Sequence, residues 1–194
     1  MIRHYFRKTF ILSLVFGMSI FLLPYGVFAQ TPTSVYVDIK PGSCPNPMNV
    51  KSQGVLMVAI LGTVDLDVAT IDPASIKMVL PGGTEVAPIR SSIADVATYV
   101  ETPTISDCGG ACYTQTGDGY DDLTVKFRTQ DIVAALELEL EEGEELTDGT
   151  CIMLTLTGVL DGETTAITGT DYVTLLVKGN QYNYRHRHRN LPEE

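Results

Sequence analysis

The sequence contains no tryptophan, and all three of its histidines lie near the two ends, outside the segment from Gln30 to Lys178. The lack of histidine in this segment excludes histidine-based acid–base catalysis and catalytic triads there. Carboxylate pairs of the glycoside hydrolase type remain as a catalytic alternative. However, sugar subsites usually need flat aromatic platforms, which only tyrosines such as Tyr99, Tyr113 and Tyr120 could supply. We therefore predict that the protein is not an enzyme.

Basic residues are also few. Lys and Arg number 13 against 24 Asp and Glu, so the formal net charge is −11. Removal of the first 29 residues, which carry three basic and no acidic side chains, would change this charge to −14. Such an acidic surface argues against nucleic acid and anionic membranes as partners of the folded body, and it is compatible with divalent cations.

Only one long apolar run is present, and it lies at the start of the chain. Basic residues precede the run, which ends in Val27-Phe28-Ala29, so residues 1–29 are predicted to be a cleaved signal peptide. The alternative is a retained membrane anchor, because an uncut run of this length could span a bilayer. Cleavage predicts a secreted protein without membrane insertion, located extracellularly, at the cell surface or in the periplasm.

Four cysteines follow the predicted signal peptide, which suits an oxidising compartment and predicts two disulfides. Three pairings are possible. We expect Cys108 to pair with Cys112, because Gly109-Gly110 lets the chain fold back, and Cys44 to pair with Cys151. The rival interpretation is a four-cysteine zinc site, which secreted chains seldom keep because their thiols oxidise.

Short apolar runs between turn-forming residues dominate the chain after residue 30. Val35–Ile39 alternates, with Tyr36, Asp38 and Lys40 on the second face, which is typical of a half-buried strand. Gly54–Leu61 has no polar residue, which predicts a central strand covered on both faces. The other predicted strands are Leu66–Val68, Ile76–Leu80, Glu85–Arg90, Asp95–Val100, Leu123–Phe127, Thr150–Leu160, Thr164–Ile167 and Thr170–Lys178.

A single short helix is predicted at Ile132–Leu136, with Thr129 and Asp131 as candidate caps. Helices between the strands, which a parallel α/β sheet would need, are absent from the pattern. Turn signals at intervals of about ten residues instead predict an all-β fold, an immunoglobulin-like antiparallel β-sandwich with one short helix. We place this domain at residues 30–179.

Two charged segments stand out. Glu137–Asp148 holds seven acids, which predicts a solvated acidic loop or, alternatively, a cation-binding patch. Residues 180–194 form a basic tail in which Arg185, Arg187 and Arg189 alternate with two histidines. We expect a flexible terminus. The alternatives are tethering to an anionic surface polymer and docking onto the acidic segment of a neighbouring copy.

Several motifs together carry a family resemblance over about Val35 to Val177. They are VDIKPGSCPNPMNVKSQGVLMVAILGT, DLDVATIDPASI, DGYDDLTVKF and LTGVLDGETTAITGTDYV. These runs resemble a secreted bacterial β-sandwich module of unassigned function, which occurs alone or appended to other domains. The resemblance implies an extracellular β-sandwich with a calcium-type loop, and it supplies no catalytic residue.

One loop has the pattern of a calcium site. Asp118 and Gly119 match positions five and six of a D-x-[DN]-x-[DN]-G loop, and Asp122 matches position nine. Thr114 and Thr116 stand where two acidic or amide ligands belong, and no glutamate follows at position twelve. The candidate ligands for Ca²⁺, the one cofactor considered, are therefore Asp118, Asp122, Thr116 and Thr114. The structural alternative is a turn at Gly119 with Asp122 capping the next strand.

Two functional hypotheses follow from these observations. The first is a non-catalytic exported structural or adhesive module, with calcium as a stabiliser, that contacts extracellular macromolecules. The second is a self-assembling surface or filament subunit, whose partners are copies of itself. In that case the leader Gln30–Ser34 would be donated to a neighbour's sheet edge.

Overall fold

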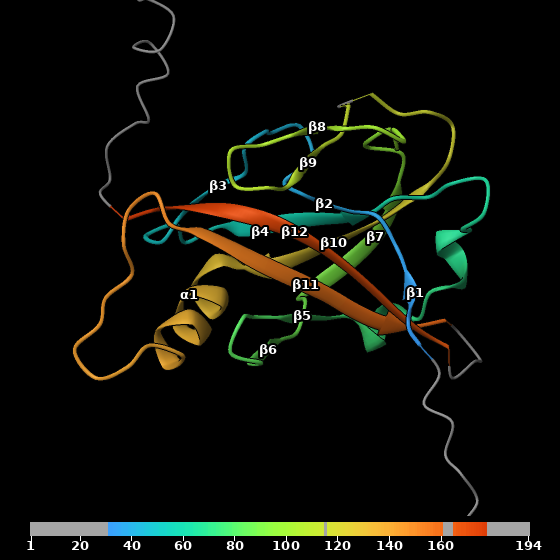
Figure 1. The fold of residues 1–194 in the computed structure, drawn as a ribbon. Coiled ribbons are helices and arrows are strands. Elements are labelled where there is room, and N and C mark those ends of the chain that lie inside the picture. The colour runs from blue at the N-terminus through green and yellow to red at the C-terminus, as the bar shows by residue number, and fades with distance from the viewer. Residues whose placement is uncertain (1–30, 115, 161–164, 178–194) are drawn as a thin grey trace, which may run out of the picture.

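The computed structural model describes residues 31–114, 116–160 and 165–177, and it shows two β-sheets packed face to face with one α-helix at one end (Figure 1). This confirms the predicted all-β sandwich with one short helix. The predicted signal peptide (1–29) and basic tail (180–194) lie outside the described residues.

One sheet has the order β2-β4-β10-β7, formed by Val37–Ile39, Val55–Ile60, Asp122–Arg128 and Arg90–Ala94. β4 and β10 are antiparallel, with Leu123 opposite Ile60. β4 lies inside the sheet, and its residues Val58, Ala59 and Ile60 are fully buried. The prediction of a central strand is therefore confirmed, and its polar-free sequence reflects cover on both faces.

The other sheet has the order β1-β12-β11-β5-β6, with β3 also beside β12. Its strands are Thr33–Ser34, Ala166–Leu176, Cys151–Val159, Lys77–Val79, Glu85–Val86 and, for β3, Pro47–Asn49. β12 joins two predicted strands, Thr164–Ile167 and Thr170–Lys178, into one, because it pairs with β11 along the whole length of β11. The β1–β12 and β3–β12 pairs are parallel, so the sandwich is not purely antiparallel.

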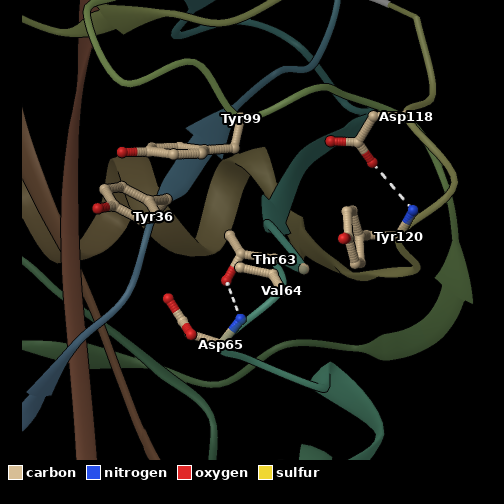
Figure 2. Close-up of a pocket in the computed structure, with 8 residues that line it drawn as sticks. Tyr36, Thr63, Val64, Asp65, Tyr99, Asp118 and Tyr120 are labelled. Carbon is tan, nitrogen blue, oxygen red and sulfur yellow. Dashed lines mark hydrogen bonds between the residues drawn. The ribbon is translucent and has the colours of Figure 1, made fainter.

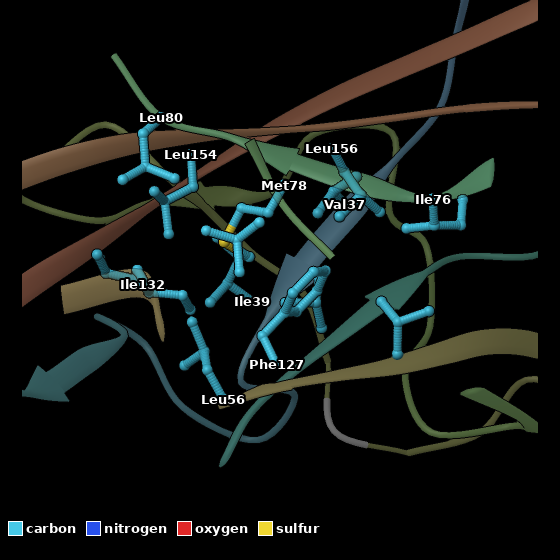
Figure 3. Close-up of a cluster of buried hydrophobic side chains, with 14 of the residues drawn as sticks. Val37, Ile39, Leu56, Ile76, Met78, Leu80, Phe127, Ile132, Leu154 and Leu156 are labelled. Carbon is cyan, nitrogen blue, oxygen red and sulfur yellow. The ribbon is translucent and has the colours of Figure 1, made fainter. Parts of the chain in front are cut away.

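The hydrophobic core lies between the two sheets (Figure 3). Phe127 of β10, Ile39 of β2 and Leu156 of β11 meet there, and each is at most 2 % exposed. Burying a side chain of this size stabilises the fold by roughly 1.5–3 kcal/mol. Ile132 of helix α1 extends the core at its end and is also fully buried.

Helix α1 spans Thr129–Leu138 and is longer than predicted. Neither Thr129 nor Asp131 caps it, so that prediction was wrong. The N-cap position is Arg128, without a side-chain hydrogen bond, and Thr129 is a buried residue of the first turn. Gln130 instead fastens the helix start by donating to the carbonyls of Val50 and Ser52, at 2.9 and 2.7 Å. In the part of the chain that the structure describes, no helix has the length and apolarity to cross a membrane.

Three weaker strand predictions were wrong in extent or kind. The segment Glu85–Arg90 is a strand only at Glu85–Val86, and β7 begins at Arg90. The segment Asp95–Val100 is irregular apart from one bridge between Thr98 and Thr114. Within Leu66–Val68, a bridge at Leu66 leads into a 3₁₀ helix that starts at Val68.

The four cysteines form two disulfides, as predicted, but the predicted pairing was wrong. Cys44 is bonded to Cys112 and Cys108 to Cys151, with Cα–Cα distances of 5.6 and 5.5 Å. The predicted pairing failed because the segment forms a hairpin, β8 (Thr104–Ile105) with β9 (Ala111–Cys112). Cys108 lies in the hairpin turn and Cys112 in its second strand. The two cysteines therefore bond to two different parts of the body, and together they fasten the hairpin to the sandwich.

Candidate functional site

The long connection between β7 and β10, residues 95–121, covers part of the outer face of the β2-β4-β10-β7 sheet. Ala97 is buried against Ala59 and Leu61, and Tyr99 and Tyr113 pack at the edge of this small cluster. The connection therefore hides one face of β4 from solvent. It also brings its own tyrosines next to residues that follow β1 and β4.

A pocket of about 300 Å³ opens where these segments meet (Figure 2). Tyr36 enters from the link between β1 and β2, and Tyr99, Asp118 and Tyr120 come from the 95–121 connection. The turn 62–65, directly after β4, supplies the remaining lining residues. We call this the tyrosine pocket.

Two of its tyrosines are stacked. The rings of Tyr36 and Tyr99 have centroids 4.1 Å apart and planes inclined by 30°. Hydrogen bonding with the Tyr36 hydroxyl, followed by burial, raises the pKa of the Tyr99 phenol to about 12. Tyr99 is therefore uncharged at neutral pH. Tyr36 and Tyr120 are 42 % and 45 % exposed, so both rings remain accessible to a ligand.

The loop that carries Asp118 is held by an acid that the sequence pattern did not indicate. The carboxylate of Asp95 accepts hydrogen bonds from the N–H groups of Asp118 and Gly119, at 3.0 and 2.9 Å. A side chain at Gly117 would collide with the same carboxylate. Gly119 has a φ of 92°, a left-handed conformation that favours glycine. Asp118 then accepts a 2.9 Å bond from the N–H of Tyr120.

The predicted calcium ligand Asp122 is engaged inside the protein. Asp122 is fully buried, and its carboxylate accepts backbone N–H bonds from Gly62, Val96 and Ala97 at 2.8–3.0 Å. Burial raises the pKa of Asp122, although these bonds oppose the shift. Within the described ranges, no group of three or more His, Cys, Asp or Glu side chains is placed to hold a metal ion. Calcium binding stays a prediction.

The two threonines among the predicted calcium ligands make contacts within the 95–121 connection. Thr114 forms the bridge with Thr98, and the carbonyl of Thr116 accepts a hydrogen bond from the Thr98 hydroxyl. Both contacts fasten Thr114 and Thr116 to Thr98, near the start of the connection. The residues that the calcium pattern selects therefore stabilise the loop beside the tyrosine pocket.

A second group of acids lies buried beneath the hairpin. Asp38 and Asp171 are 3 % and 1 % exposed. Burial, with the neighbouring charge of Asp171 next in importance, raises the pKa of Asp38 to about 7. Burial also raises the pKa of Asp171 to about 6, against the opposing effect of its hydrogen bonds. The sequence pattern placed Asp38 on a solvated face, and that was wrong because the hairpin and its flanking segments cover this face.

Tyr113 lies near both buried carboxylates. Burial and the charges of Asp171 and Asp38 raise the pKa of its phenol to about 12. Asn46 donates to Asp171 Oδ2 at 2.9 Å and to the Tyr172 carbonyl at 3.0 Å. Its own Oδ1 is buried without a hydrogen-bond partner among the described residues. The buried acids and Asn46 therefore form a polar cluster inside the sandwich that a ligand cannot reach from solvent. The tyrosine pocket, in contrast, is accessible.

Comparison with known proteins gives little beyond this geometry. No family model matches the chain, and no curated protein matches it. A solved structure with some similarity is AggA, the major subunit of aggregative adherence fimbriae type I from Escherichia coli. It is 13 % identical, with a TM-score of 0.25, over 77 % of this chain and 100 % of that chain.

Proposed function

We propose that the protein is a non-catalytic exported module with a structural or adhesive role at the cell exterior. The observation that carries the proposal is the fastening of the hairpin by Cys44–Cys112 and Cys108–Cys151. Disulfides of this kind persist in oxidising compartments outside the cytoplasm. They stiffen the long connection that supplies three of the eight lining residues of the tyrosine pocket. A rigid surface loses less conformational entropy on contact with a partner.

The tyrosine pocket is the contact surface in this proposal. Tyrosine is enriched where proteins bind one another, because its ring gives a large contact area and its hydroxyl a hydrogen bond. The absence of histidine between Gln30 and Lys178 supports a role in binding over catalysis. Extracellular macromolecules are therefore the expected partners.

To test this proposal, the full chain with its leader is expressed in a bacterial host and its location is determined. We expect recovery outside the cytoplasm, a mature N-terminus at Gln30 and no alkylatable thiol. The mature protein is then immobilised and exposed to a panel of surface polysaccharides and extracellular matrix proteins, with Tyr120→Leu as the variant. Binding that weakens in Tyr120→Leu supports the proposal. Reduced cysteines in the cytoplasm, or no retention of any polymer by the wild type, would contradict it.

The proposal includes stabilisation of the module by calcium. Asp95 and Asp118 present two exposed carboxylates at one loop, which supports a weak site there. A ligand that binds only the folded state stabilises it by about 2.7 kcal/mol at a hundred times its dissociation constant. Thermal unfolding with Ca²⁺ and with chelator, repeated on Asp118→Ala, tests this. A chelator-sensitive rise in Tm that Asp118→Ala removes is expected, and equal Tm values would exclude calcium stabilisation.

Self-assembly is a second candidate, favoured by the position of β1. Thr33 and Ser34 pair with Ile167 and Thr168 at the edge of the sheet, and both are exposed. A strand of only two residues holds its place weakly, so a neighbour could take it up in the strand-addition mode. Size-exclusion chromatography of the mature protein with and without residues 30–34 tests this. Concentration-dependent growth that the truncation abolishes supports assembly, and a monomer at all concentrations excludes it.

A further inference from the structure

The tyrosine pocket combines aromatic faces with negative charge. Three phenol rings line it together with the carboxylates of Asp65 and Asp118, and none of its lining residues is basic. Cations bind over the faces of tyrosine rings, where the electrons of the ring attract positive charge. Carboxylates add charge-assisted hydrogen bonds to N–H donors. The tyrosine rings and the carboxylates therefore both favour a positively charged ligand.

Both carboxylates keep oxygens for a ligand. Asp118 uses Oδ1 to accept the Tyr120 N–H, and no contact with another described residue engages its Oδ2. At Asp65, the hydrogen bond to the Thr63 hydroxyl comes from the backbone N–H, so it does not occupy the carboxylate. In Figure 2 Asp118 lies beside Tyr120 on one side of the pocket, and Asp65 lies apart from it, beyond Thr63. The stacked rings of Tyr36 and Tyr99 lie on the side away from Tyr120. The pocket therefore offers a positively charged group two separate acids.

The stacking of Tyr36 on Tyr99 decides against a sugar. A ring 4.1 Å from its neighbour has one face already covered, so the pair offers less flat surface than a sugar platform needs. A compact cation needs only one exposed face and nearby acceptors. The chain's formal charge of −11, or −14 after loss of the leader, also raises the concentration of cations near the surface.

We infer that the tyrosine pocket binds an organic cation, an alkylammonium or guanidinium group, between its tyrosine rings and the carboxylates of Asp65 and Asp118. The inference rests on the proposed function and gives its contact surface a ligand class. The cation could belong to a lysine or arginine side chain of an extracellular protein, or to a free polyamine or quaternary amine. The chemistry is the same, and the probes below separate the two sources.

The experiment uses the ¹⁵N-labelled oxidised mature chain, with chelator present to exclude metal effects. N-Acetyl-L-argininamide, choline and spermidine are titrated separately, and neutral N-acetyl-L-citrullinamide, which has no free amine, is the matched control for the first. We expect saturable shifts of the amide signals of residues 63–65 and 118–120 with the cations and none with N-acetyl-L-citrullinamide. Added salt should weaken the binding, since these charges lie at the surface. A short peptide with one internal arginine, compared with spermidine, distinguishes a protein side chain from a free amine by relative affinity.

Variants assign the roles of the pocket residues. Asp65→Asn and Asp118→Asn should each weaken argininamide binding about two- to fivefold, the effect of one exposed charge pair. Tyr120→Leu should weaken choline binding by a similar factor, and Tyr120→Phe should leave it unchanged because the ring face remains. Glu85→Gln, an exposed acid on β6, is the control and should change nothing.

Three results would overturn the inference. They are equal shifts with neutral N-acetyl-L-citrullinamide, affinities unchanged in both Asp→Asn variants, and no shift with any cation at concentrations that shift surface amides elsewhere. Failure of the proposed function would appear in other measurements, namely the cell compartment of the protein, the state of its thiols and its retention of polymers. Polymer binding that depends on Tyr120 without any response to cations would reject only the ligand class. The amide spectrum of each variant verifies that it is folded.

Discussion

The carboxylate of Asp171 accepts a 2.8 Å hydrogen bond from the backbone N–H of Ile39. Asp171 lies on β12 and Ile39 on β2, so this bond joins the two sheets of the sandwich. The same carboxylate also accepts the Tyr172 N–H and the Asn46 amide. It is a buried charge whose cost of burial is offset by three donors.

Asp38, the residue before Ile39, makes stability depend on pH. Its pKa is raised from 3.8 to about 7 in the folded state, so the folded protein holds this proton more tightly than the unfolded chain does. The resulting stabilisation is complete below about pH 4 and is lost as pH rises through 7. Asp38→Asn should therefore stabilise the protein at pH 8, by about 1–3 kcal/mol, and have little effect near pH 4.

Urea unfolding of the wild type and Asp38→Asn across this range gives the measurement. The other titrating groups near Asp38 are Asp171, Asp122 and Tyr113, and all three are present in both proteins. Asp131→Asn, at an exposed helix position, is the control for the general effect of removing one negative charge. A stabilisation by Asp38→Asn that is equal at pH 4 and pH 8 would mean that this carboxyl does not titrate in the predicted window.

Removing the Asp171 side chain should destabilise the fold much more than removing an exposed acid. Asp171→Ala leaves the N–H groups of Ile39 and Tyr172 without this acceptor, and the Asn46 amide keeps only the Tyr172 carbonyl. A buried donor without a partner costs about 1–3 kcal/mol. We expect a loss of at least that size in the free energy of unfolding at pH 7, with Asp131→Ala nearly neutral. A loss below about 0.5 kcal/mol would show that water replaces the carboxylate.

The disulfide pairing can be checked directly. Proteolysis of the unreduced mature protein and mass spectrometry should give the peptides Cys44–Cys112 and Cys108–Cys151. These bonds close chain segments with separations of 68 and 43 residues, each worth about 4 kcal/mol in the chain-entropy model. Cys108→Ala/Cys151→Ala should therefore lower the stability of the oxidised protein substantially. Recovery of a Cys108–Cys112 peptide would refute the arrangement.

Local patterns predicted the parts of the fold that local burial decides. β4, β10 and β11 were found from apolar runs and alternation, because each position's character follows from the face on which it lies. The same local alternation wrongly predicted that Asp38 lies on a solvent-exposed face. Its face is covered by a segment more than 55 residues later in the chain, and no alternation in β2 could reveal that cover.

The tyrosine pocket shows the same limit. The sequence marks Tyr99 and Tyr120 only as rare aromatic side chains, and Tyr36 only as the outward residue of a strand. The pocket exists because the 95–121 connection folds back over β4, fixed by Asp95, Asp122 and two disulfides. These contacts join residues that are distant in sequence, so neither spacing nor composition indicated them. The predicted disulfide pairing failed for this reason too, since spacing favoured a bond between Cys108 and Cys112, and each of them bonds to a residue distant in sequence.

The close approach of β12 to the chain entering β2 gives a last prediction. A Cβ atom at Gly169 would lie 2.5 Å from both the Val35 carbonyl oxygen and Val37 Cγ2. Gly169→Ala must therefore separate the two segments, which should cost about 1–3 kcal/mol as in other overpacked sites. Gly54→Ala is the matched control, because its added methyl would meet only Ser52 Oγ at 3.3 Å, and its effect should stay within about 0.5 kcal/mol. Urea unfolding followed by tyrosine fluorescence compares the two variants. Equal midpoints would mean that β12 and β2 can move apart without loss, and that the sheets are held mainly by the Asp171 bonds and the core.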